Sequence, residues 1–291
     1  MAFFDIKASK GETINVGLFQ NPADFAAYVE KAAKVSPFFE RSSDFYGATP
    51  TQTLERLHKG APQRVAAVDR VLDKVENSVD FCSARYVMRA AVAGGVPCVP
   101  SALAGVPTAM RARRRVVDDM GPLAVFIDMG LSASVKDHTI ARRGAAALAL
   151  VRLLSATRPV ELWTFTAQTV DHRSDTPRNA ITAIRLDTAP LDLARAAWLL
   201  CAPEAFRRAG FASSSALAGL PKNFDVNWLF DDHKRHNSAL PSLLVKAFGD
   251  SDRLVIPALF TGGETQFNDD ATAIAWVQNM IEQHSGLLEA A

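Results

Sequence analysis

Oxygen-bearing side chains follow one strongly apolar segment of the chain. The segment 123–127 reads Leu-Ala-Val-Phe-Ile, and Asp128 ends it. Ser132 and Ser134 come shortly afterwards. A carboxylate with nearby hydroxyls is a donor set that suits Mg²⁺, a hard ion that takes oxygen ligands and keeps several waters. The spacing therefore predicts a divalent-metal site at Asp128 and Ser132, with Ser134 as a further ligand.

The same residues admit two other interpretations. Asp128 can cap the helix that follows, with the serines bonded to backbone groups. Alternatively, Gly130-Leu131-Ser132 begins like the nucleophile elbow of a serine hydrolase, which requires glycine two residues after the serine. This chain has Ser134 there, so we expect a non-catalytic protein and keep the hydrolase as a weak third interpretation. The histidines available as its base would be His233, His236 and His284.

An arginine cluster precedes the apolar segment, and it comprises Arg111, Arg113, Arg114 and Arg115. Such a cluster can contact nucleic-acid phosphates with strong salt dependence. However, Asp118 and Asp119 follow at once, and no aromatic residues alternate with the arginines. Neither a phosphate-binding loop nor a dinucleotide-binding glycine fingerprint occurs. We therefore expect a solvated surface or an interface with an acidic partner, and neither nucleic-acid binding nor nucleotide hydrolysis.

The pattern of apolar residues predicts an α/β fold in the second half of the chain. A buried strand reads as a continuous apolar run, and helices show apolar residues at helical spacing. The predicted strands are 123–127, 160–166, 180–186 and 254–260. Helices are predicted over 137–156, 191–201 and 271–281. Right-handed crossovers give the strand order 3-2-1-4, with the third strand antiparallel at the edge. Thr261 would then lie beside Asp128, at the carboxyl edge where open α/β sheets bind ligands.

This order of elements resembles the von Willebrand factor type A domain over roughly residues 120–285. The resemblance implies a three-layer, doubly wound sandwich, with a mostly parallel sheet and one antiparallel edge strand. That family binds a divalent metal through Asp-x-Ser-x-Ser after its first strand, and the metal recognises a carboxylate of a partner protein. Here the motif reads Asp128-Met129-Gly130-Leu131-Ser132.

The resemblance also implies the remaining ligands. Thr188 matches a threonine that the family places before a middle helix. The family's Thr-Asp-Gly after the fourth strand reads Thr261-Gly262-Gly263 here. Gly130 and Gly262 therefore replace a serine and an aspartate of the family motif. We expect a degenerate metal site, with Gly130, Gly262 and Gly263 in the loops that face a partner.

Further short segments resemble uncharacterised tailed-phage proteins that contain such a domain. They are 45–49, 93–97, 103–107 and 158–163. Phage proteins of this kind often lie near the gene of a partner ATPase. The resemblance implies a protein-interaction module in the host cytoplasm or the virion, with an AAA+ ATPase, other phage proteins or further copies of itself as partners. The alternative is a structural virion or assembly component without metal.

The bulk properties fit a globular protein. The chain has 291 residues, is 48% hydrophobic and carries a net charge of +1. Its three cysteines are widely spaced, which favours a reducing compartment over a disulfide framework. The first residues lack the layout of a signal peptide, and no apolar run reaches the length of a membrane span. We expect a mostly helical N-terminal region over 1–115 and the A-like domain over 116–291.

Overall fold

The computed structural model describes most of the chain. The described residues are 1–8, 11–36, 39–41, 44–78, 86–93, 95–115, 122–170, 178–188, 190–219, 226–229, 233–249, 251–260 and 263–284.

The central sheet has the path β1-β2-β8-β7-β6-β10, and β9 pairs with β7 outside this path. Its strands are β1 (Ala2–Lys7), β2 (Thr13–Phe19), β6 (Leu123–Asp128), β7 (Val160–Val170), β8 (Arg178–Leu186), β9 (Val226–Trp228) and β10 (Arg253–Ile256). β6 pairs in parallel with both β7 and β10, and β8 is antiparallel to β7. The predicted order 3-2-1-4 is therefore confirmed as β8-β7-β6-β10.

The apolar run of β6 is buried on both faces of the sheet. Leu123, Val125 and Ile127 belong to one hydrophobic cluster, and Ala124 and Phe126 belong to the other. Successive side chains of a strand point to opposite faces, so a run without polar residues needs cover on both sides. The prediction of a central buried strand is confirmed.

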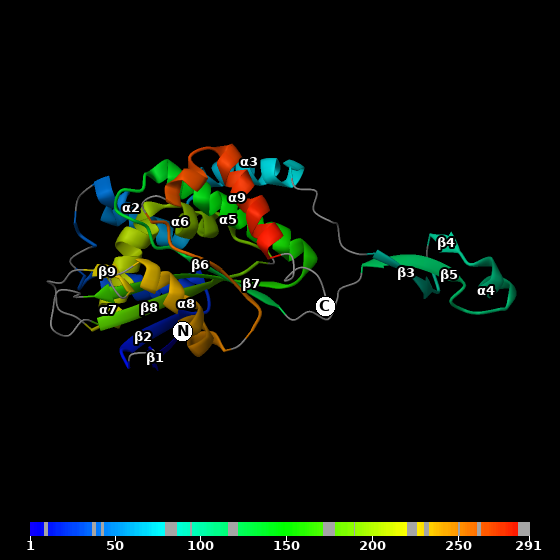
Figure 1. The fold of residues 1–291 in the computed structure, drawn as a ribbon, viewed down its shortest axis with the longest axis horizontal. Helices are drawn as coiled ribbons and strands as arrows, with labels where there is room; N and C mark the ends of the chain where they lie inside the picture. The colour runs from blue at the N-terminus through cyan, green and yellow to red at the C-terminus, as the bar shows by residue number, and fades with distance from the viewer. Residues whose placement is uncertain are drawn as a thin grey trace.

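Helices cover both faces of this sheet. α1 (Pro22–Ala33), α3 (Pro62–Ser78), α5 (Asp137–Thr157), α6 (Leu193–Cys201) and α9 (Asp270–Gln283) contribute to the first cluster. α2 (Pro50–Lys59) also joins this layer, whose helices gather on one side of the sheet in Figure 1. α8 (His233–Phe248) covers the other face through Leu240, Leu243 and Leu244. The result is a mixed α/β fold compatible with a three-layer sandwich.

The N-terminus changes the expected edge of the sheet. β2 pairs in parallel with β8 from Ile14 opposite Asn179 to Phe19 opposite Ile184, and β1 then pairs with β2. The prediction that the third strand lies at the edge is therefore wrong. The expectation of a mostly helical region over 1–115 is also incomplete, because this region contains five described strands, of which two join the central sheet. A domain boundary near residue 115 remains a prediction.

A second, small sheet lies between α3 and β6 in the sequence. It consists of β3 (Tyr86–Ala91), β4 (Val96–Pro97) and β5 (Met110–Arg115), together with the short helix α4 (Val99–Leu103). The order is β3-β5-β4, and both pairings are antiparallel. Figure 1 shows this unit standing apart from the main sheet. Among the described helices of the chain, none is both long and apolar enough to cross a membrane.

Candidate functional site

The loop after β6 is held between β7 and β10 by backbone hydrogen bonds. Met129 donates to the Phe165 oxygen over 2.7 Å, and Ser132 donates to the Leu259 oxygen over 2.9 Å. Leu259 in turn donates to the Gly130 oxygen over 2.9 Å. The ends of β6 and β10 therefore lie side by side at the carboxyl edge, as predicted. Thr261 and Gly262 lie outside the described residues.

Asp128 is completely buried at this edge. Its Oδ1 accepts a hydrogen bond from the backbone N–H of Gly130 over 2.8 Å. The N-cap residue of α5 is Lys136, whose side chain makes no capping bond. Asp128 lies earlier in the chain and is therefore not the cap of that helix. Its carboxylate instead stabilises the turn into the loop.

A buried cation accompanies Asp128. Arg143 of α5 is 2% exposed and donates to the backbone oxygens of Asp128, over 2.8 Å, and Pro257, over 2.6 Å. Burial lowers the pKa of Arg143 to about 10, and the negative charge of Asp128 opposes this effect. A positive charge of the protein itself therefore faces the aspartate that would bind a metal. This guanidinium charge would repel a divalent ion placed beside Asp128.

Thr188 does not join this site. Its Oγ1 donates to the Val160 oxygen over 2.9 Å, and Val160 pairs with Leu123 at the start of β6. Asp128 pairs with Phe165 at the other end of the same strands. Val160 and Phe165 are five residues apart along β7, which corresponds to about 16 Å. The prediction that Thr188 completes the metal site is wrong, because β8 runs antiparallel and returns the chain to the opposite edge.

The other predicted site residues differ in their access to solvent. Gly130 is buried, so the expectation that it faces a partner is wrong. Ser132 is partly buried and Ser134 is exposed, with their hydroxyl oxygens 3.4 Å apart. Gly263 begins the short helix η4 (Gly263–Phe267). Within the described part of the chain, no group of three or more His, Cys, Asp or Glu side chains could hold a metal ion.

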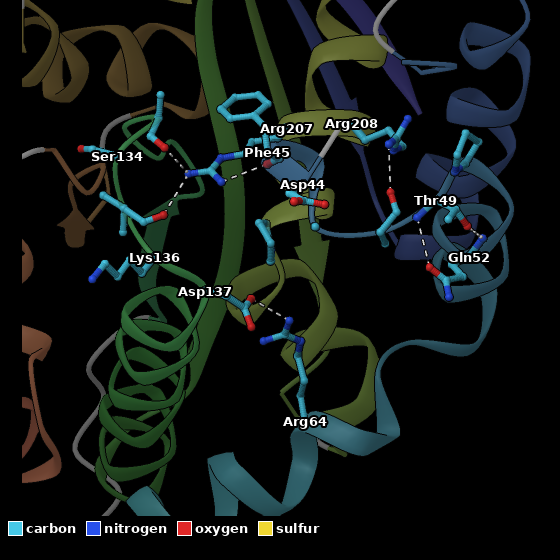
Figure 2. A pocket seen from close by; sticks show the side chains of 16 residues that line it. Asp44, Phe45, Thr49, Gln52, Arg64, Ser134, Lys136, Asp137, Arg207 and Arg208 are labelled. Atoms are coloured by element: carbon cyan, nitrogen blue, oxygen red, sulfur yellow. Dashed lines mark hydrogen bonds and ion pairs between the residues drawn. The ribbon is translucent and has the colours of Figure 1, made fainter. Parts of the chain in front are cut away.

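A pocket of about 800 Å³ opens beside this loop. Its walls come from the β6–α5 loop, from the segment around η1 (Asp44–Tyr46) and the start of α2, and from the π-helix η2 (Ala205–Gly210). Figure 2 shows side chains from these segments around one hollow. The charged residues that line it are Arg64, Lys136, Arg207, Arg208, Asp44 and Asp137. Loops from distant parts of the sequence therefore meet at the carboxyl edge of the sheet.

Arg207 ties these segments together. Its guanidinium donates to the backbone oxygens of Phe45 over 3.0 Å, Ser132 over 2.8 Å and Val135 over 3.1 Å, and it lies 4.6 Å from the centre of the Phe45 ring. Figure 2 shows this side chain between the β6–α5 loop and Phe45. Burial lowers the pKa of Arg207, and the charge of Asp137 opposes the shift. Its Nε is buried without a hydrogen-bond partner.

Arg208 holds the segment around η1, which forms another wall of the pocket. It donates to the oxygens of Phe39, Arg41 and Ala48, the last over 2.9 Å, and lies 4.6 Å from the Tyr46 ring centre. Both arginines thus have backbone carbonyls as their hydrogen-bond acceptors in the described part of the chain. π-Helical turns are rare and often occur at functional sites. Here the wide turn of η2 carries the two arginines as consecutive residues.

The lining of the pocket carries a net positive charge, with four basic side chains against two acidic ones. Lys136 is exposed at the start of the 21-residue helix α5, whose N-terminal backbone N–H groups carry a partial positive charge. Arg64 pairs with Asp137 over 2.8 Å and also donates to the Cys201 oxygen. Asp44 is the other acidic side chain of the lining. An anionic group entering the pocket would therefore meet more positive charge than negative charge.

Sequence reasoning missed Arg64, Arg143, Arg207 and Arg208. One signal was present, because Arg207 and Arg208 interrupt a stretch that is otherwise rich in alanine and phenylalanine. Charged residues on the buried side of a helix need partners, and such partners come from segments far away in sequence. The sequence alone does not reveal these segments.

The comparisons with known proteins bear on the whole chain. The sequence model of a family described as Domain of unknown function (DUF7192) matches residues 10–287. The chain belongs to the DUF7192 family. The match includes the small sheet, the pocket and every strand of the central sheet except β1. Neither the curated proteins nor the solved structures gave a match.

Proposed function

We propose that this DUF7192 chain is a non-catalytic protein-interaction module that receives an acidic segment of a partner protein in the pocket at the carboxyl edge. The observation that carries the proposal is the pocket itself, an open space of about 800 Å³ lined by four basic and two acidic side chains. The cations Lys136 and Arg64 lie at or near its surface, and the N-terminus of α5 adds partial positive charge.

The rigidity of the walls supports a recognition role. Arg207 and Arg208 fix three loop segments through bonds to at least six backbone oxygens. Preorganised loops lose little conformational entropy when they bind, so a larger share of the contact energy appears as affinity. The sheet and these arginines would hold the pocket in shape before the partner arrives.

In this proposal the module works without a metal. The positive charge of Arg143 near Asp128 supports a metal-free module, because the guanidinium stands where a metal ion would add positive charge. The sequence resemblance to tailed-phage proteins suggests the biological setting, the host cytoplasm or the virion. It also suggests the partner, which would be an AAA+ ATPase, another phage protein or a second copy of the chain. A structural virion or assembly component without metal would use the same pocket.

Site-directed photo-crosslinking tests the proposal. A photoreactive amino acid replaces the exposed Ser134 at the pocket, and in a matched control it replaces the exposed Lys246 on α8 across the sheet. Crosslinks are formed in a lysate of the phage-infected or prophage-carrying host, with EDTA present during irradiation. We expect one defined protein adduct at position 134, competed by a glutamate-rich peptide and absent at position 246. Equal adducts at both positions, or an adduct at 134 that such a peptide does not compete, would contradict the proposal.

A further inference from the structure

The small sheet and its connecting helix, residues 86–115, have an unusual charge. This unit, called the β3–β5 ribbon below, contains no Asp, Glu or Lys, and its charged side chains are Arg89, Arg111, Arg113, Arg114 and Arg115. The whole chain has 32 Lys and Arg against 31 Asp and Glu. Without these five arginines, the rest of the chain has a net charge of −4. Positive charge is therefore concentrated in the ribbon, and acidic residues outnumber basic residues in the rest of the chain.

The acidic residues that weighed against a phosphate-binding role are not part of this sheet. β5 ends at Arg115, and Asp118 and Asp119 lie beyond it, outside the described residues. Within the ribbon, Arg113 pairs with Met88, Arg114 with Val87 and Arg115 with Tyr86. The residues opposite these arginines in the backbone register are uncharged.

Exposed apolar side chains gather at the same unit. They are Val92, Val96, Val99, Leu103 and Val106, and their exposed fractions run from 42% to 84%. They lie at the end of the ribbon away from Arg115, around β4 and α4, beside the exposed Arg111. Clustered apolar exposure in a soluble protein marks an interaction surface. The partner must therefore accept both many positive charges and several apolar side chains.

Duplex DNA accepts both. Proteins that read DNA with β-strands place them in the major or the minor groove. Arginines bind backbone phosphates, and apolar side chains of architectural proteins insert between base steps and kink the duplex. We propose that the β3–β5 ribbon binds duplex DNA through its arginines, with the apolar end around α4 against the bases. This surface is separate from the pocket, and its role does not depend on the function proposed above.

The salt dependence of binding sets the expected result. Arg111, Arg113 and Arg115 occupy alternate positions on β5 and so belong to one face of the sheet. Three phosphate contacts give a slope of about −2.7 in a plot of log K against log salt, so affinity falls about 40-fold between 50 and 200 mM salt. The test uses the full chain and a fluorescent 24-base-pair duplex, with anisotropy as the readout. Replacing Arg111, Arg113, Arg114 and Arg115 together by Gln should weaken binding by at least about 100-fold at 50 mM salt.

Matched variants keep the test decisive. A control replaces four exposed lysines by Gln, and these are Lys31, Lys34, Lys59 and Lys246. This control removes the same number of positive charges from outside the ribbon, and its affinity for DNA should stay within about threefold of that of the wild type. Replacing the four ribbon arginines by Lys should preserve most of the affinity, which separates loss of charge from loss of folding. Val99→Ser with Leu103→Ser should reduce DNA bending, measured by energy transfer between the duplex ends.

Three results would overturn the proposal. The first is a salt slope near zero, or equal binding by the wild type and the Gln variant. The second is a change from dimer to monomer in the Gln variant without DNA binding by the wild type, which would assign the ribbon to a second copy of the chain. The third is binding to anionic vesicles without binding to DNA, which would assign it to a lipid surface.

Discussion

Arg143 donates a hydrogen bond over 2.8 Å to the backbone oxygen of Asp128, and both residues are buried at the carboxyl end of β6. The carboxylate of Asp128 accepts from Gly130, and its charge favours the protonated form of Arg143. A side chain of α5 therefore places a positive charge near this aspartate.

Arg143→Met should destabilise the protein strongly. The substitution leaves the buried backbone oxygens of Asp128 and Pro257 without this donor, at a cost of about 1–3 kcal/mol for each oxygen, and it removes a positive charge near the Asp128 carboxylate. Adding Asp128→Asn should recover part of this loss, because no buried charge then remains. Urea unfolding followed by circular dichroism measures both variants. A double variant no more stable than Arg143→Met would show that the two charges are not coupled.

Arg207→Lys should lower stability by about 2–3 kcal/mol, although it keeps the positive charge. Lysine cannot reach the oxygens of Phe45, Ser132 and Val135 together, so buried carbonyls lose their donor. The loop around Ser134 should then exchange its amide hydrogens faster. Hydrogen-exchange mass spectrometry of peptides from this loop checks the result. Unchanged protection there would show that Arg207 does not hold the loop.

The buried thiol of Cys201 should make the folded protein less stable as the pH rises above about 9. Burial raises the pKa of its thiol to about 12 from the ordinary 9.0, so above pH 9 the unfolded state releases a proton that the folded state keeps. Stability should fall with a slope approaching 1.4 kcal/mol per pH unit between about pH 9 and 10. Above pH 10 the lowered pKa of Arg143 acts in the opposite direction. Urea unfolding at pH 8.0, 9.0 and 10.0 should show the fall in the wild type and a flatter profile in Cys201→Ala.

Gly144 marks a close approach of α5 to α6. A Cβ atom there would lie 2.4 Å from the Leu200 oxygen and 2.5 Å from the Cys201 sulfur. Gly144→Ala should therefore cost about 1–3 kcal/mol through overpacking. Gly95→Ala is a matched control, because nothing lies within 4 Å of a Cβ at that position. Thermal unfolding should separate the two variants, and equal melting temperatures would contradict the packing of these helices.

Much of the central sheet could be predicted from the sequence. The apolar run before Asp128 identifies a strand buried on both faces, and the alternation of strands and helices gives the order β8-β7-β6-β10. The position of β2 beside β8 could not be predicted. Pairing between residues 14–19 and 179–184 is a long-range contact, and the local pattern of either strand does not name its neighbour.

The candidate site was predicted only in part. The location at the end of β6 is supported by the pocket beside Ser134, because topology brings strand ends together. Its chemistry was missed, since Arg143 and Arg207 lie on helices 15 or more residues away and act through tertiary contacts. Thr188 lies at the opposite edge because β8 runs antiparallel to β7, and a short motif carries no information on strand direction.

The most direct test of the account is the affinity for an acidic peptide with and without metal. A fluorescein-labelled hexaglutamate peptide is titrated with the wild type, Lys136→Glu and the control Lys246→Glu, each in EDTA and in Mg²⁺. We predict binding of wild type and control that is the same in both buffers, and binding about tenfold weaker in Lys136→Glu. Binding that requires Mg²⁺, or that is equal in all three proteins, would contradict the metal-free pocket.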